Sequence, residues 1–203
     1  MSQYFTNDKT LTSRERIVSF ELFNKQFELK SDRGVFSKSQ IDEGTRILLE
    51  VLVPSDLGKR VLDLGCGYGV LGLVLAYFQK EVSFVLADIN ERAVLLASKN
   101  ARSLGLANRV ACLHSDIYQN VTGTFDSIVL NPPIRAGKKV TYAMYEGAKG
   151  HLVEGGSLYI VIRKAQGAES ASKYIESIFG NISLIKRSRG YFVFKASNYP
   201  AEK

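Results

Sequence analysis

Apolar and polar positions from residue 59 onward alternate between two kinds of pattern. Short continuous apolar runs, as at residues 82–87, are typical of strands buried on both faces, and apolar stripes at helical spacing predict amphipathic helices. The apolar runs predict strands at residues 60–64, 82–87, 109–113, 125–130, 157–163, 182–188 and 191–197. The stripes predict helices at residues 69–79, 91–104, 138–152 and 167–179. This alternation predicts an α/β fold, a doubly wound and mostly parallel sheet of seven strands.

Both ends of the chain depart from this alternation. The last two predicted strands are separated only by residues 188–190, which is too short for a parallel crossover, so the last strand is expected to be antiparallel. Near the other end, residues 17–22 and 27–30 alternate in part, which predicts a β-hairpin that turns at residues 24–25.

A helix is predicted around residues 47–52, between this hairpin and the first strand of the sheet. We therefore expect two parts in the chain. Residues 1–58 would form an N-terminal extension, made of hairpin, loop and helix and packed on the core, and residues 59–203 would form the core itself.

The composition is that of a globular protein, with 45% hydrophobic and 23% charged residues among 203. No apolar run approaches the ~20 residues that a membrane span requires, and the first residues lack the apolar segment of a signal peptide, so a cytoplasmic protein without a membrane partner is expected. Cys66 and Cys112 lack the spacing of metal ligands, so we expect reduced thiols and no metal. The net charge of +7 is compatible with nucleic-acid contact and equally with a solvated surface. The oligomeric state stays open.

A glycine-rich loop follows the first core strand. Gly65, Gly67 and Gly69 allow a sharp turn and the close approach of a ligand to the backbone, and the helix after them presents unpaired amides. Residues 67–72 also match the dinucleotide pattern G-x-G-x-x-G, with Asp88 at 21 residues from Gly67 as its acidic ribose partner. An NAD-dependent oxidoreductase is therefore a competing interpretation.

Acidic residues around this loop favour a different ligand. Asp63 lies inside the strand before the glycines, where it can reach a cationic amino group but would repel a pyrophosphate. Asp116 follows the third core strand and suits an adenine amine. No pair of residues typical of hydride transfer stands out. The alternative role for Asp88 and Asp116 is helix N-capping, since both follow strands.

A second loop, Asn131-Pro132-Pro133-Ile134, directly follows the fourth core strand. On its own such a run is a common turn that ends a strand. At the carboxyl end of a strand in an α/β sheet, however, it occupies a ligand position. The Asn131 side-chain oxygen and the Pro132 carbonyl can accept hydrogen bonds from an NH₂ group and so favour methyl transfer to a planar exocyclic nitrogen. The prolines make the loop rigid.

The glycine loop with its Asp63 resembles the first motif of the class I S-adenosylmethionine-dependent methyltransferases. The resemblance implies S-adenosylmethionine as cofactor, with Asp88 at its ribose hydroxyls, Asp116 at the adenine amine and Ile89 on the adenine face. The cofactor-binding positions that it implies are Asp63, Gly65, Cys66, Gly67, Gly69, Asp88, Ile89, Asp116, Ile117 and Asn131.

Over most of its length the chain also resembles the ribosomal RNA small subunit methyltransferase C family. The resemblance is carried by residues 34–37, 42–45, 65–69, 131–137 and 162–168. It implies methylation of a guanine N2 in 16S rRNA, with the rRNA or the small ribosomal subunit as partner. It also implies that Phe36, Ser37 and Thr45 line the methionine end of the cofactor, although Phe36 can equally be a core residue. Members of the family can carry two tandem domains, and this chain has room for one.

Three alternatives to guanine N2 stay open. Methylation of a protein glutamine amide or of adenine N6 is disfavoured, because Ile134 replaces the aromatic residue common in those enzymes. A non-catalytic RNA-binding module of the same fold would not need residues 131–133. For an RNA acceptor, Arg135, Lys138 and Lys139 are the expected substrate contacts beside the loop.

Overall fold

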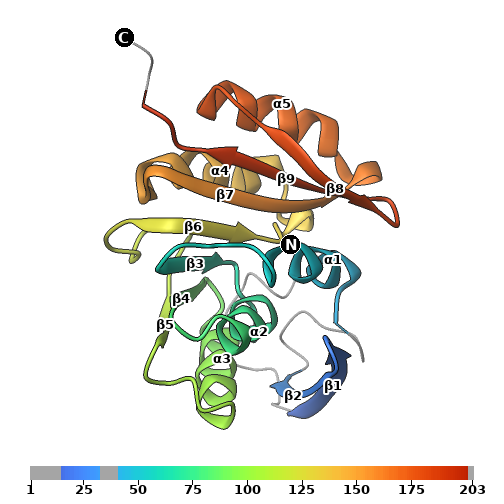
Figure 1. Cartoon of the computed structure of the whole chain (residues 1–203), viewed down its shortest axis with the longest axis vertical. Coiled ribbons are helices and arrows are strands. Elements are labelled where there is room, and N and C mark those ends of the chain that lie inside the picture. Colours follow the sequence, from blue (N-terminus) through green and yellow to red (C-terminus); the bar gives the residue numbers. More distant parts are fainter. Residues whose placement is uncertain (1–14, 33–40, 201–203) are drawn as a thin grey trace.

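Seven strands pair into one sheet within residues 15–32 and 41–200, the part of the chain that the computed structural model describes. The sheet order is β5-β4-β3-β6-β7-β9-β8, and only the pairs that include β9 are antiparallel (Figure 1). The predicted sheet and its antiparallel last strand are thus confirmed. Its strands are β3 (Arg60–Leu64), β4 (Ser83–Asp88), β5 (Val110–His114), β6 (Phe125–Leu130), β7 (Leu152–Arg163), β8 (Ser183–Ser188) and β9 (Tyr191–Ser197).

Helices cover both faces of this sheet, because successive side chains of a strand point to opposite sides. In β3, Val61 joins the apolar cluster formed with α1, α2 and α3, whereas Leu62 and Leu64 join the cluster formed with α4 and α5. The helices are α1 (Glu43–Leu52), α2 (Val70–Phe78), α3 (Glu91–Ser103), α4 (Lys138–His151) and α5 (Ala168–Phe179), with short 3-10 turns η2 (Ile134–Ala136) and η3 (Lys164–Gln166).

The order of the strands creates a switch point between β3 and β6. After β3 the chain builds β4 and β5 on one side, and then returns to the other side of β3 as β6. The parallel register pairs Asp63 with Val129, so Gly65 and Asn131 follow at the same level beyond the two strand ends. Open α/β sheets bind ligands at such a point, outside the carboxyl ends of the strands. The topology therefore brings the glycine loop and the Asn-Pro-Pro loop together.

The N-terminal hairpin forms a separate two-stranded sheet of β1 (Arg16–Leu22) and β2 (Lys25–Ser31). Phe23 and Asn24, at φ 48° and 58°, make its turn, which is the two-residue geometry that suits twisted antiparallel strands. The turn thus starts one residue before the predicted position. A phenylalanine is tolerated there because its ring packs edge-on against Phe78 of α2, with centroids 5.5 Å apart.

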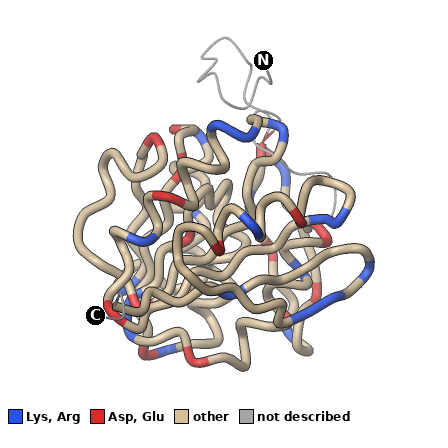
Figure 2. The backbone as a smooth tube through the Cα atoms, turned by 90° about the horizontal axis from the view of Figure 1, so that it is seen from above, with Lys and Arg blue, Asp and Glu red and all other residues tan. Residues whose placement is uncertain are grey.

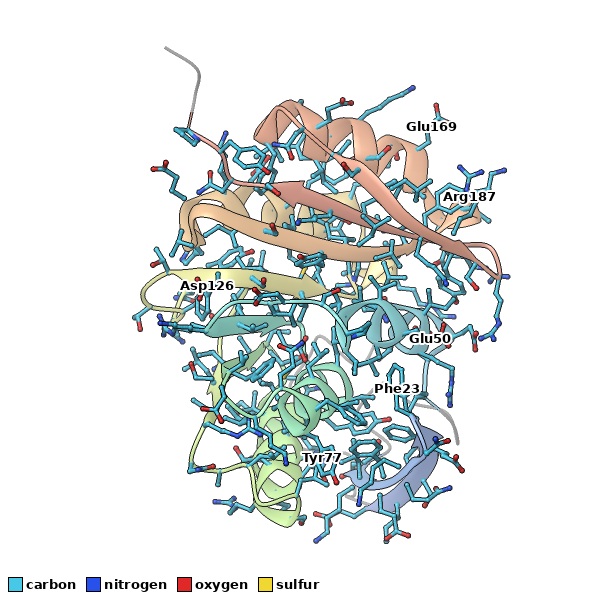
Figure 3. All side chains as sticks on the ribbon, viewed as in Figure 1. Phe23, Glu50, Tyr77, Asp126, Glu169 and Arg187 are labelled. Atoms are coloured by element: carbon cyan, nitrogen blue, oxygen red, sulfur yellow. The ribbon has the colours of Figure 1, made fainter. Side chains whose placement is uncertain are left out.

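Packing and hydrogen bonds join the hairpin to α2 and α3. Phe27 contacts Tyr77 of α2 edge-on at 5.3 Å, and Figure 3 shows Tyr77 on the side of α2 that faces the hairpin. The buried Asn100 of α3 donates to the carbonyls of Lys30 and Tyr68, both at 2.9 Å, and accepts from the Lys30 amide at 2.8 Å. Since Tyr68 belongs to the glycine loop, one amide side chain fixes that loop to the hairpin.

The long strand β7 begins at Leu152, earlier than the predicted start at residue 157 and directly after α4. The sequence signal was obscured by Gly155 and Gly156, which are typical strand breakers. Tertiary contacts keep this stretch paired, since the Gly155 amide donates to the Asn198 carbonyl at 2.8 Å. A Cβ on Gly156 would lie 2.9 Å from the Val153 carbonyl, so close backbone packing requires glycine there.

Candidate active site

The glycine loop is held by backbone hydrogen bonds to the neighbouring strand. Gly65 and Cys66 donate to the Ala87 carbonyl at 2.7 and 3.1 Å, and Gly67 donates to Asp88 Oδ2 at 2.8 Å. Gly65, Gly67 and Gly69 have φ of 75°, 58° and 96°, which side chains disfavour. Gly65 is exposed, and the nearest described atom to a Cβ built on it is Met144 Cε, at 3.4 Å. The loop is therefore shaped to receive a ligand against its backbone.

Asp63 lies beneath the loop, buried to 1% exposure. Its Oδ2 accepts from the Gly72 amide at 2.8 Å, so the carboxylate satisfies an N-terminal amide of α2. Burial raises the pKa of Asp63 to about 7, the negative charge of Asp88 adds to that rise, and the Gly72 hydrogen bond opposes it. The predicted contact of Asp63 with a ligand's amino group stays a prediction.

Gly72 is a site residue that sequence reasoning missed as a contact of Asp63. A Cβ on it would lie 2.7 Å from Leu86 Cδ1 and 3.0 Å from Asp63 Oδ2. The position is therefore restricted to glycine so that α2 can approach β3 and β4. The glycine pattern of residues 67–72 marks this position in the sequence but does not indicate its contact with Asp63.

Asp88 ends β4 with its side chain buried and fixed. Its Oδ1 accepts from the Asn90 amide and its Oδ2 from the Gly67 amide, both at 2.8 Å. The N-cap of α3 is Asn90, whose Oδ1 accepts from Ala93 at 3.1 Å, so the alternative of helix capping by Asp88 is wrong. The carboxylate instead braces the glycine loop at the edge of the switch point.

Asp116 and Ile117 lie in a turn after β5. Asp116 is exposed, and its carbonyl accepts from Gln119 at 3.0 Å. No α-helix of the described chain starts there, so the capping alternative for Asp116 is wrong as well. Ile117 is half-buried with φ 49°, and its carbonyl accepts from Ser115 Oγ at 2.9 Å. Ile89, also half-buried, follows β4 at the same edge of the sheet.

Neither cysteine is set up as a nucleophile. Burial, the largest cause, raises the pKa of the Cys66 thiol well above its ordinary value, and the nearby charges of Asp88 and Asp63 raise it further. Burial likewise raises the pKa of Cys112. Since only the thiolate attacks, the Cys66 thiol is unreactive there, and it donates to the Gly67 carbonyl at 3.4 Å.

The Asn-Pro-Pro loop turns within two residues of β6. Pro133, at φ −76° and ψ 78°, forms an inverse γ-turn in which the Ile134 amide donates to the Pro132 carbonyl at 2.9 Å. That carbonyl, expected from sequence to accept from a substrate amine, thus already accepts one hydrogen bond and has one lone pair left. Ile134 is half-buried against the cluster of α4 and α5.

Asn131 is held by two side chains of the N-terminal segment. Its Nδ2 donates to Asp42 Oδ2 and to Thr45 Oγ1, both at 2.9 Å. Asp42 is also the N-cap of α1, since its Oδ2 accepts from the Thr45 amide at 3.1 Å. Thr45 was expected at the cofactor and Asp42 was not assigned a role. The pattern Asp-x-x-Thr before an apolar run indicates the cap, but only the fold shows its contact with Asn131.

Arg135, Lys138 and Lys139 lie beside this loop, in η2 and at the start of α4, and all three are exposed. Figure 2 shows Lys and Arg positions on several sides of the molecule, so charge alone does not single out one face. Their relevance rests on their place next to the loop. Phe36 and Ser37, the other positions expected at the cofactor, lie outside the described residues.

The described residues contain neither a candidate metal site nor a candidate membrane-spanning helix. Across residues 15–32 and 41–200, no group of three His, Cys, Asp or Glu side chains is placed to hold a metal ion. Within the same ranges, no helix has both the length and the apolar composition to cross a membrane.

Comparison with known proteins relates the chain to one family. The model of the methyltransferase small domain matches residues 26–195. A Bacillus subtilis protein, YbxB, is 43% identical over 199 residues, which is 97% of this chain and 98% of that protein. The ribosomal RNA small subunit methyltransferase C of Vibrio parahaemolyticus is 34% identical over 182 residues, covering 86% of this chain and 50% of that one.

A solved structure agrees with these relatives. The T. thermophilus 16S rRNA N2 methyltransferase (RsmC), in complex with AdoMet and guanosine, matches with a TM-score of 0.81 and 29% identity over 92% of this chain and 51% of the other. The chain thus spans about half the length of the RsmC proteins that it matches. On the evidence of its fold, its two loops and these matches, the chain belongs to the methyltransferase small domain family.

Proposed function

We propose that the protein transfers a methyl group to the N2 amine of a guanine in small-subunit rRNA. As a member of its family it is a methyltransferase that uses S-adenosylmethionine. The observation that carries the acceptor class is the placement of Asn131 and Pro132, two hydrogen-bond acceptors, level with the glycine loop at the β3–β6 switch point. The choice of guanine and of rRNA as acceptor is supported by likeness to RsmC proteins, one of which was solved in complex with guanosine.

The residues around the glycine loop suit the proposed cofactor roles. Asp88, fixed by two backbone amides, would accept from ribose hydroxyls, and the exposed Asp116 would accept from an adenine amine. Ile89 and Ile117, both half-buried, would flank the adenine ring. The buried carboxylate of Asp63 has the charge to attract the cofactor's ammonium group. When bound, the cofactor supplies a methyl group on a sulfonium.

The Asn-Pro-Pro loop would orient the amine for attack. Asn131 Oδ1 and the second lone pair of the Pro132 carbonyl accept from the two N–H groups, which turns the nitrogen lone pair toward the methyl group. The bound cofactor would supply the methyl group for the new C–N bond and keep the electron pair of the broken S–C bond, while Asn131 and Pro132 would hold the amine, whose proton would then leave to water. Positive charge develops on the nitrogen during attack, so acceptors aimed at it stabilise the transition state more than the ground state.

Basic side chains beside the loop would position the RNA. Arg135, Lys138 and Lys139 are exposed and adjacent to Asn131 in the fold. Contacts from such residues go to phosphates, which fix the register of the RNA and do not select the base. Base choice would instead depend on the amine acceptors and on Ile134, whose aliphatic side chain offers no aromatic face for stacking.

The test uses the protein with methyl-labelled S-adenosylmethionine and three acceptors: naked 16S rRNA, isolated small subunits lacking the modification, and a release-factor-type protein. Digestion and mass analysis identify the labelled product. Label in N2-methylguanosine that disappears with Asn131→Ala supports the proposal. Label in glutamine or in N6-methyladenosine refutes the guanine assignment and leaves methyl transfer to a planar nitrogen in place.

A further inference from the structure

The Asn131 side chain has both N–H groups committed to the N-terminal segment. Its Nδ2 donates to Asp42 Oδ2 and to Thr45 Oγ1, each at 2.9 Å, and an amide NH₂ has two donors in all. Within residues 15–32 and 41–200, no residue donates a hydrogen bond to its Oδ1. The donor end of the amide is therefore occupied and the acceptor end is available.

Asp42 decides which way this amide points. An ionised carboxylate can only accept, so the NH₂ group must face it. In the reverse orientation Asn131 Oδ1 would meet an oxygen of Asp42, two acceptors would repel each other, and the NH₂ group would point away from α1. A substrate amine at the loop would then meet a donor where it needs an acceptor.

The carboxylate of Asp42 is itself held in place. The same Oδ2 accepts from the Thr45 amide at 3.1 Å as the N-cap of α1. A Cβ on Gly44 would lie 2.9 Å from Asp42 Oδ2 and 3.0 Å from Cε1 of Tyr191 in β9. The start of α1 is thus closely packed between the carboxylate and the sheet, and the carboxylate has little room to rotate.

We propose that Asp42, with Thr45 as second acceptor, is a positioning residue that orients the Asn131 amide with its oxygen toward the acceptor amine. This inference rests on the proposed function, because it presumes transfer to an amine held by Asn131. It assigns a positioning role to the start of α1, through two residues that lie 89 and 86 positions before Asn131 in the chain.

The first test removes the carboxylate in full-length protein. Asp42→Ala should lower kcat by about 10- to 100-fold, by analogy with the loss of a residue that orients a metal ligand, with KM for RNA and cofactor affinity within about threefold. Asp42→Asn should keep most of the wild-type activity, because its side-chain oxygen can replace Oδ2 as acceptor for Asn131 Nδ2 and for the Thr45 amide. The matched control is Glu43→Gln, the next carboxylate, which pairs with Arg189 instead of Asn131 and should leave kcat unchanged.

The second test separates orientation from helix capping. Thr45→Val removes the hydroxyl that accepts from Asn131 but keeps the amide that Asp42 caps, so a smaller fall in kcat is expected with an unchanged melting temperature. If Asp42 acts through Asn131, adding Asp42→Ala to Asn131→Ala should change kcat by less than about twofold. Additive losses in the double variant, or a loss of cofactor affinity in place of kcat, would overturn the proposal.

A third measurement does not depend on the substrate. Nitrogen-15 NMR of the Asn131 side-chain NH₂ should show slow solvent exchange in the wild type and at least tenfold faster exchange in Asp42→Ala; the order of magnitude follows from the loss of one charge-assisted hydrogen bond. Unchanged exchange refutes the inference even if no acceptor has been found. If the wild type labels adenine or glutamine, the guanine assignment fails, and the kcat comparisons are made on that acceptor.

Discussion

Replacing Asp63 with asparagine should stabilise the protein increasingly as pH rises toward neutral and alkaline values, and have little effect only below about pH 4. Burial is the main cause that raises the pKa of this carboxyl from 3.8 to about 7. A raised carboxyl pKa means that the folded state holds the proton more tightly than the unfolded chain does. The free energy of unfolding therefore falls as pH rises between those two values. The asparagine oxygen can still accept from Gly72, and the side chain carries no charge.

The size of the effect follows from the two pKa values, at about 1.4 kcal/mol per pKa unit. At pH 5.5 the folded carboxyl is protonated and the unfolded one is ionised, which costs the wild type about 2 kcal/mol. At pH 8 both are ionised, and the cost reaches its full value of about 4 kcal/mol. The advantage of Asp63→Asn over the wild type should therefore grow by about 2 kcal/mol between pH 5.5 and pH 8.

The assay is urea unfolding followed by circular dichroism at pH 5.5, 6.5 and 8. Glu154→Gln, a substitution at an exposed carboxylate, serves as the control and should show no such trend. An advantage of Asp63→Asn that is equal at all three pH values would refute the reasoning. Saturating S-adenosylmethionine should reduce the difference in the free energy of unfolding between Asp63→Asn and the wild type. The cofactor's cation beside Asp63 offsets the cost of the buried charge, and the cofactor stabilises only the protein that binds it. If the cofactor leaves this difference unchanged, the result would count against a contact of Asp63 with the cofactor.

Three further outcomes are expected. Asn131→Ala should leave cofactor affinity within a few-fold by calorimetry and lower turnover by about 10²–10³, as when one transition-state hydrogen bond is removed; a variant with more than half of the activity would mean that Asn131 is a turn residue only. Losing Lys138 and Lys139 together should weaken RNA binding and reduce the slope of log K against log salt by up to about two, whereas Lys80→Ala, at an exposed site after α2, should not change it. Asn100→Ala should lower the free energy of unfolding by about 1–3 kcal/mol and weaken cofactor binding, because buried backbone groups of the hairpin and of the glycine loop lose their partners. An unchanged cofactor affinity would show that the loop holds its shape without the hairpin.

The sequence by itself determined the architecture of the sheet. Period-two and helical spacing are local properties, so the strand at residues 125–130 and the antiparallel final hairpin could be placed without the structure. The same holds for the two loops, since glycines at residues 65, 67 and 69 and prolines at 132–133 restrict the backbone through their own chemistry. Errors arose where a distant contact outweighed a local signal, as at Phe23 and at the start of β7.

Only the tertiary structure decided how the side chains of the site are paired. The contacts between Asp63 and Gly72 and between Asp42 and Asn131 span 9 and 89 positions of the chain, and neither residue of a pair signals the other. Asp88 likewise could be a helix cap by sequence, and the fold gives that role to Asn90. The physical reason is that a carboxylate accepts from whichever donors the packing brings within about 3 Å, and the order of strands around β3 determines which donors those are.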